Sequence, residues 1–188
     1  VLVISPQSVA AAFNKGTALF DLGDYEPAIA AFNLATGHDP ALTSAHLKKG
    51  LALIAVARFE ESLESFDCVI SQAPDTYVAH EQKGIALVRL NRFADAVPAL
   101  THAIALDSTS GSVFYELGIA LSALERYEEA VAAFDRTLAL DTSYADACLH
   151  KAVALTRLGH DADAIAAFDA YTELRPTSAD AYYQKGRA

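Results

Sequence analysis

The feature that most constrains this chain is an internal repeat of constant period. Gly16, Gly50, Gly84 and Gly118 are equally spaced, 34 positions apart, and each begins a Gly-X-Ala-Leu tetrapeptide. At the next step Ala152 takes the place of the glycine. The period is kept from one end of the chain to the other without a gap, and a fixed period of this length is typical of a stacked repeat protein.

Each repeat reads as two helices. In the first repeat, apolar residues follow helical spacing over 11–22 and again over 28–35, with a glycine-containing break at 21–25. Pro40 cannot continue the second helix, which therefore ends before it. No segment alternates apolar and polar residues over the length of a strand, so the sequence predicts an all-α fold.

The recurring glycine needs an explanation, because glycine inside a helix costs roughly 1 kcal/mol relative to alanine. Two antiparallel helices approach closely only where side chains are small. We expect Gly16 on the first helix to face Ala28 on the second, with Leu19 and Phe32 filling the space beside them.

The pattern resembles the tetratricopeptide repeat family, whose 34-residue signature contains Leu-Gly, a tyrosine, and then alanine and phenylalanine. The fourth repeat carries the matching residues, which are Leu117, Gly118, Leu121, Tyr127, Ala130 and Phe134. The resemblance covers essentially the whole chain. It implies a right-handed superhelical solenoid of antiparallel helix pairs.

The period divides the chain into five full repeats, which span 9–42, 43–76, 77–110, 111–144 and 145–178. Residues 1–8 align with the end of a preceding repeat and 179–188 with the start of a sixth. We therefore expect a single repeat array, 1–188, belonging to a longer protein. Repeat arrays need polar capping units, so such ends favour end-to-end self-association.

Several positions depart from the family pattern. The family's tryptophan position holds Ala12, His46, His80, Phe114, Cys148 and Tyr182. The position before the glycine, leucine in the family, is mostly lysine, at Lys15, Lys49, Lys83, Lys151 and Lys185. We expect the histidines to be part-buried packing residues, Cys148 to be a buried small hydrophobe, and the lysine stems to lie along the stack with their ammonium groups in water.

In the family, the first helices line a concave groove. The resemblance implies that the groove residues here are Phe13, Phe20, Leu47, Leu51, Ile54, Glu81, Ile85, Val88, Arg89, Tyr115, Ile119, Leu149, Val153 and Arg157. In one column the family usually has asparagine or another polar residue, but this chain has Leu51, Ile85, Ile119 and Val153. An exposed apolar stripe indicates an interaction surface, unless internal curvature or self-contact covers it.

Other function classes find little support. Nucleophile-elbow, phosphate-loop and dinucleotide motifs are missing, and the paired histidines and cysteines are too few for a zinc site, so we expect no enzyme, no cofactor and no metal. A net charge of −10 argues against binding nucleic acid or an anionic membrane surface. The longest apolar runs are too short for membrane insertion.

These observations favour a non-catalytic protein–protein interaction scaffold that binds a peptide or amphipathic helix in an apolar concave groove. Two alternatives stay open. One is a structural repeat module that associates with itself, and the other is a regulatory repeat domain of a larger enzyme.

Overall fold

The computed structural model describes residues 6–176, and this part of the chain contains ten α-helices and no strand. The helices are α1 (Pro6–Asp21), α2 (Tyr25–His38), α3 (Thr43–Ala55), α4 (Phe59–Gln72), α5 (Tyr77–Arg89), α6 (Phe93–Leu106), α7 (Gly111–Ala123), α8 (Tyr127–Leu140), α9 (Ala145–Leu158) and α10 (Asp161–Leu174). The expected all-α fold is confirmed. The expected partial repeats at 1–8 and 179–188 fall almost wholly outside the described residues, so the division into repeats stays a prediction.

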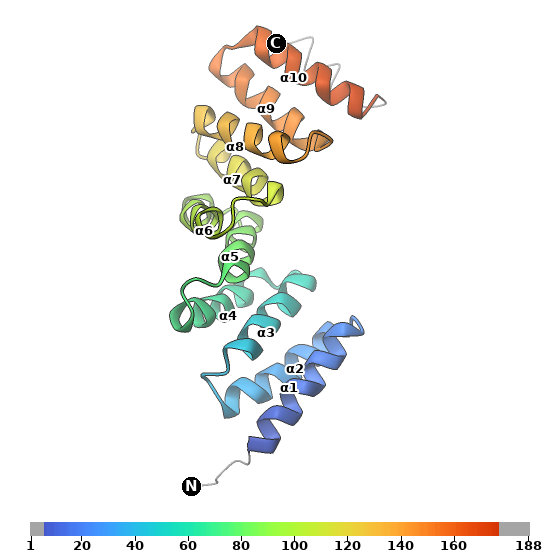
Figure 1. The fold of residues 1–188 in the computed structure, drawn as a ribbon, viewed down its shortest axis with the longest axis vertical. Coiled ribbons are helices and arrows are strands. Elements are labelled where there is room, and N and C mark those ends of the chain that lie inside the picture. The colour runs from blue at the N-terminus through green and yellow to red at the C-terminus, as the bar shows by residue number, and fades with distance from the viewer. Residues whose placement is uncertain (1–5, 177–188) are drawn as a thin grey trace. The chain divides into compact units, whose positions relative to one another are not determined.

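The helices belong to two compact units, residues 1–91 with α1–α5 and residues 92–188 with α6–α10 (Figure 1). In the first unit, α1 packs on α2 and α3 on α4, and each pair also packs on the next helix along the chain. In the second unit, α7 packs on α8 and α9 on α10, and α8 also packs on α9. Each unit is therefore a stack of helix pairs.

In the first, second and fourth repeats, the atoms nearest the glycine of the column belong to a buried phenylalanine ring, whereas the sequence suggested an alanine. A Cβ placed on Gly16 would lie 2.7 Å from the Phe32 ring, and one on Gly118 would lie 2.5 Å from the Phe134 ring. Both rings are fully buried. The glycine is needed because a ring from the second helix lies against the backbone of the first, and ring burial offsets the helix cost.

The turn between the two helices of a repeat uses a left-handed residue each time. Gly23 and Gly159 have positive φ, and so do the non-glycine residues Ala57, Asn91 and Glu125, which lie in the same repeat column. A left-handed conformation costs a residue with a Cβ roughly 1–2 kcal/mol. At Ala57 and Glu125 the packing of α3 on α4 and of α7 on α8 offsets that cost.

Lysines before the glycine column join neighbouring repeats by ion pairs. Lys83 pairs with Asp67 in the first unit, and the Lys151 Nζ lies 2.6 Å from the Asp135 Oδ1 in the second. Each lysine side chain is only about a quarter exposed. The sequence predicted that these ammonium groups would be in water, but in these two repeats they bind a carboxylate of the preceding second helix.

Candidate peptide-binding surface

Within each unit, the first helices of successive repeats lie against one another. Helix α3 contacts both α1 and α5 in the first unit, and α7 contacts α9 in the second. The candidate groove residues named from the sequence all lie on these five helices. We call the surface that they form the first-helix face and describe it separately for each unit.

In the first unit, most of the apolar candidates are half-buried and not fully exposed. Leu47, Leu51 and Ile54 pack against the buried cluster of Phe66, Val69 and Ala79. These side chains therefore belong partly to the core and present only one edge to the surface.

Further along the same face, Ile85 on α5 is half-buried. Val88 is 5% exposed, so it offers almost no surface to a ligand. Arg89 is exposed at the end of α5.

Phe20 forms an aromatic and cationic contact on the first-helix face. Its ring meets Tyr25 edge to face with 5.4 Å between centroids, and the Lys48 Nζ lies 5.3 Å from its centroid. A cation over a ring face is attracted by the ring quadrupole. Phe20 is thus held from two sides, and Lys48 places a positive charge on this face.

Glu81 is the acidic candidate of the first unit. The Tyr77 hydroxyl donates to its Oε1 at 2.9 Å, and the Gln82 Nε2 lies 3.4 Å from its Oε2. These donors fix the carboxylate on the surface of α5, where it is half-buried.

Each unit has a cavity, of about 430 Å³ in the first unit and about 350 Å³ in the second. The cavity of the first unit lies beside Phe13. Its apolar lining comes from Val9, Phe13 and Leu42. Its polar lining comes from Asn14, Asp39 and Ser44. Of the candidate groove residues in the first unit, Phe13 is the one that lines this cavity, where the first repeat meets the second.

In the second unit, Tyr115 is the centre of an aromatic cluster that the sequence analysis did not identify. Its ring lies 4.9 Å from Tyr144, 5.7 Å from His150 and 6.0 Å from Phe134, between centroids. His150 also stacks on Phe134 at 6.0 Å. Burial lowers the pKa of His150, and the nearby Asp146 carboxylate opposes that shift.

His150 could have been found from the sequence by its column. It stands one period after Glu116 and two periods after Gln82, in a column of polar residues on the first helices. Glu116 is itself buried. Polar side chains that recur at one buried or half-buried position are the signal that was missed.

The remaining candidate groove residues of the second unit differ in how exposed their side chains are. Ile119 is half-buried and packs with Tyr115 against the Phe134 cluster, and Leu149 packs against the Phe168 cluster. Val153 is 38% exposed. Arg157 is exposed near the end of α9.

Two hydroxyl groups on first-helix positions are buried without a hydrogen-bond partner in the described part of the chain. They are the Thr17 Oγ1 on α1 and the Ser122 Oγ on α7. Buried polar groups in proteins are normally paired, and leaving one unpaired costs about 1–3 kcal/mol. Both residues stand in columns of the first-helix face, but their oxygens are buried and therefore not open to a ligand.

His46 and His80, at the family's tryptophan position, each make a hydrogen bond to the backbone. The Nε2 of His46 donates to the Pro40 carbonyl at 3.0 Å, and that of His80 donates to the Pro74 carbonyl at 2.6 Å. Both bonds tie a first helix to the loop before it. Among residues 6–176, no group of three or more His, Cys, Asp or Glu side chains could hold a metal ion.

A helix that crosses a bilayer needs about 20 mostly apolar residues. Over the same stretch, no helix combines the length and the apolar character needed to cross a membrane.

Family models identify the class of protein. Two models, both described as Tetratricopeptide repeat, match this chain, one over residues 47–111 and 115–179 and the other over residues 9–42. The chain belongs to the tetratricopeptide repeat family, and the expected resemblance is confirmed. A search of curated protein sequences gave no match.

Solved structures show the same fold at low sequence identity. A MamA crystal structure is 20% identical with a TM-score of 0.86, covering 94% of this chain and 96% of MamA. MamA residues 41 to the end from Desulfovibrio magneticus RS-1 are 20% identical with a TM-score of 0.83, covering 92% and 97%. YrrB, described as a tetratricopeptide repeat protein with an unusual peptide-binding site, is 20% identical with a TM-score of 0.86, covering 93% and 90%.

Proposed function

We propose that this chain is a non-catalytic interaction scaffold whose first-helix face binds a peptide or an amphipathic helix of a partner protein. The observation that carries the proposal is a set of apolar side chains that recur at one position of successive first helices and keep part of their surface open. These are Leu51 and Ile85 in the first unit and Ile119 and Val153 in the second. YrrB, which shares the fold, supports it through its reported peptide-binding site.

The ligand's chemistry follows from the residues of the face. The apolar side chains that recur along the first-helix face suit a segment that presents apolar side chains on one side. The chain carries a net charge of −10, so basic residues flanking that segment would speed association with it. Lys48 and Glu81 stand beside the apolar residues of the first unit and would orient the bound segment.

The test is selection of binding peptides from a random display library on the purified chain, followed by affinity measurement on variants. Val153→Asp is expected to weaken binding at least tenfold if the peptide lies on the second unit, and Ile85→Asp if it lies on the first. Leu140 on α8 is 42% exposed, close to the 38% of Val153, so Leu140→Asp is the matched control for the second unit. Leu34 on α2, 60% exposed, serves the first.

Melting temperatures separate loss of the surface from loss of the fold. We expect Val153→Asp and Leu140→Asp to melt within a few degrees of the unmodified chain, because neither buries its new carboxylate. Peptides that bind every variant equally well would count against the proposal. A chain that sediments as an oligomer, and that does so only while Val153 and Ile85 are intact, would replace it with self-association.

A further inference from the structure

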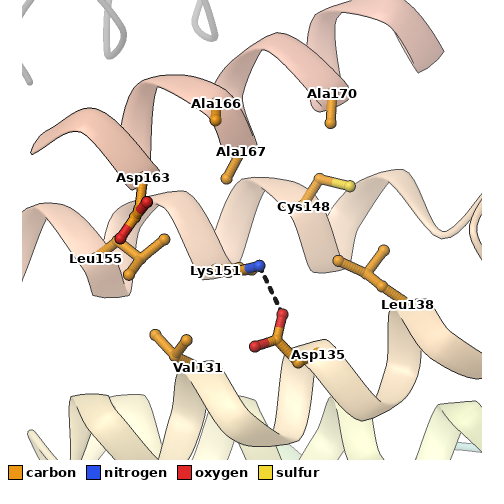
Figure 2. A pocket seen from close by; sticks show the side chains of 10 residues that line it. All are labelled: Val131, Asp135, Leu138, Cys148, Lys151, Leu155, Asp163, Ala166, Ala167 and Ala170. Atoms are coloured by element: carbon orange, nitrogen blue, oxygen red, sulfur yellow. Dashed lines mark ion pairs between the residues drawn. The ribbon is translucent and has the colours of Figure 1, made fainter. Parts of the chain in front are cut away.

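A second cavity, of 350 Å³, lies where the fourth and fifth repeats meet, between α8, α9 and α10 of the second unit (Figure 2). Residues of α9 other than those on the first-helix face line it, including Cys148, Lys151 and Leu155. Helix α10 contributes three alanines, Ala166, Ala167 and Ala170, to the lining. The volume is at the lower end of the roughly 300–1,000 Å³ of known small-ligand pockets.

Two positions that hold large side chains in the fourth repeat hold small ones in the fifth, and both small residues line this cavity. Cys148 and Ala170 stand one period after Phe114 and Arg136. In the fourth repeat, the Arg136 Cζ lies 5.5 Å from the centroid of the Phe114 ring, which is 8% exposed. In the fifth repeat, both the ring and the guanidinium are missing, and the cavity is lined by the two small residues that replace them.

The lining combines apolar side chains with two carboxylates, Asp135 on α8 and Asp163 on α10 (Figure 2). Val131 and Leu138 from α8 and Leu155 from α9 form apolar walls. The Lys151–Asp135 ion pair crosses the cavity wall, so the charge of that lysine is already balanced. Asp163 on α10 is exposed and turns towards Leu155, which places a carboxylate at the cavity. Burial raises the pKa of the Cys148 thiol, which keeps that end of the cavity uncharged at neutral pH.

We propose that this cavity binds an aromatic side chain of a partner polypeptide, with an adjacent arginine or lysine directed at Asp163. The fourth repeat supplies the precedent for the ring, since Phe114 stands there in the place of Cys148, with Arg136 against it in the place of Ala170. The cation is argued from charge: Asp135 already has Lys151 as its partner, whereas Asp163 adds a further, exposed carboxylate to the lining. The site is separate from the first-helix face, so it stands or falls independently of the proposed peptide groove.

The probe is a blocked tetrapeptide, Gly-Phe-Arg-Gly, titrated into the full chain and followed by NMR of the alanine methyl groups. A single ring in a small pocket gives a dissociation constant on the order of 1 mM. We expect saturable shifts at Ala166, Ala167 and Ala170. The matched peptides Gly-Ala-Arg-Gly and Gly-Phe-Glu-Gly are expected to bind at least tenfold and about threefold more weakly.

Two variants locate the binding. Asp163→Asn changes an exposed side chain and should leave the fold intact. It should reduce the roughly threefold preference for arginine over glutamate to about one. The double variant Cys148→Phe with Ala170→Arg rebuilds the fourth-repeat pair and should abolish binding. A second readout uses the Cys68→Ser chain, in which Cys148 is the only cysteine, and bound peptide should slow its alkylation.

The inference is overturned if none of the three peptides shifts the alanine methyl groups at a peptide concentration about tenfold above that expected dissociation constant, or if the shifts persist unchanged in the double variant. It is also overturned if these methyl groups shift with protein concentration alone, since the occupant is then a second copy of the chain.

Discussion

The fourth and fifth repeats share a fold but fill it differently. Phe134 and Phe168 stand in the same column, and the exposed fraction of each is at most 1%. The other aromatic position is not kept, since Phe114 is replaced by Cys148. The buried phenylalanine between the two helices is thus kept in both repeats. The large residue at the family's tryptophan position is not kept, and in the fifth repeat a cavity lies beside the small residue found there.

The same two repeats differ at the contact with the ring and at the turn. Gly118 meets the Phe134 ring, while Ala152 stands in the corresponding place and belongs to the cluster of Phe168. At the turn, Glu125 has φ of 60° and Gly159 has φ of 74°. The fourth repeat thus has the glycine at the helix contact, and the fifth has it at the turn.

Removing the buried ring should have the largest effect in either repeat. We expect Phe134→Ala and Phe168→Ala each to lower the free energy of unfolding by about 3–5 kcal/mol, because each leaves a cavity between the helices of a pair. Urea denaturation followed by circular dichroism measures both. Leu140→Ala, at an exposed site on α8, is the control and should change stability by less than about 0.5 kcal/mol. If Phe168→Ala costs no more than this control, the two rings do not have the same role.

Adding a methyl group at the helix contact should have the next largest effect. Gly118→Ala places a Cβ 2.5 Å from the Phe134 ring and should destabilise the chain by about 1–3 kcal/mol, despite the better helix propensity of alanine. Gly111→Ala is the matched control, since its Cβ would meet its nearest neighbours at an ordinary 3.6 Å. The melting temperatures of the two variants test this prediction. A Gly118→Ala chain that is more stable than the unmodified chain would contradict it, because the Phe134 ring would then move aside without cost.

Exchanging the turn residue should stabilise the fourth repeat. Glu125→Gly relieves a left-handed conformation but increases the entropy of the unfolded chain, so the net gain is about 0.5 kcal/mol. The reverse change in the fifth repeat, Gly159→Glu, should be destabilising. Chemical denaturation of both variants tests the pair, and a loss of stability in Glu125→Gly would show that the glutamate side chain has a role that outweighs the strain.

The smallest effect concerns His150, which replaces Glu116 of the fourth repeat. Its pKa is lowered in the folded chain, so the unfolded state binds more protons as the pH falls through the ordinary value near 6.5. The contribution of His150 to stability should therefore decrease from pH 7.5 to pH 5.5, and His150→Gln should remove that part of the slope. His160→Gln, at an exposed position, is the control. If both variants change the dependence of stability on pH equally, His150 is not the group responsible for it.

The sequence predicts the helix pairs and the family because periodicity records which faces are buried. It did not predict which group lies nearest to Gly16, since small size at one residue indicates a close approach but not which group approaches. The structure shows the Phe32 ring, four residues beyond Ala28 and on the same side of α2. Column arithmetic alone could not distinguish the two.

The binding surfaces were harder to predict than the fold. Val88 was placed on the groove by its column, yet it is buried, because the exposure of one position varies between repeats with the neighbours that cover it. The cavity beside Cys148 depends on two residues far apart in the sequence, Cys148 and Ala170, which are both small in the same repeat. Only the packing of α8, α9 and α10 brings that coincidence into one place.

The most direct test of the proposed function is methyl NMR of the full chain with a peptide selected on it. If the first-helix face is the binding surface, the largest shifts will fall on Leu51 and Ile85, on Ile119 and Val153, or on both sets. Leu34 and Leu140 on the second helices will shift little. Large shifts confined to those second-helix leucines, with the first-helix methyl groups unchanged, would contradict the proposed function.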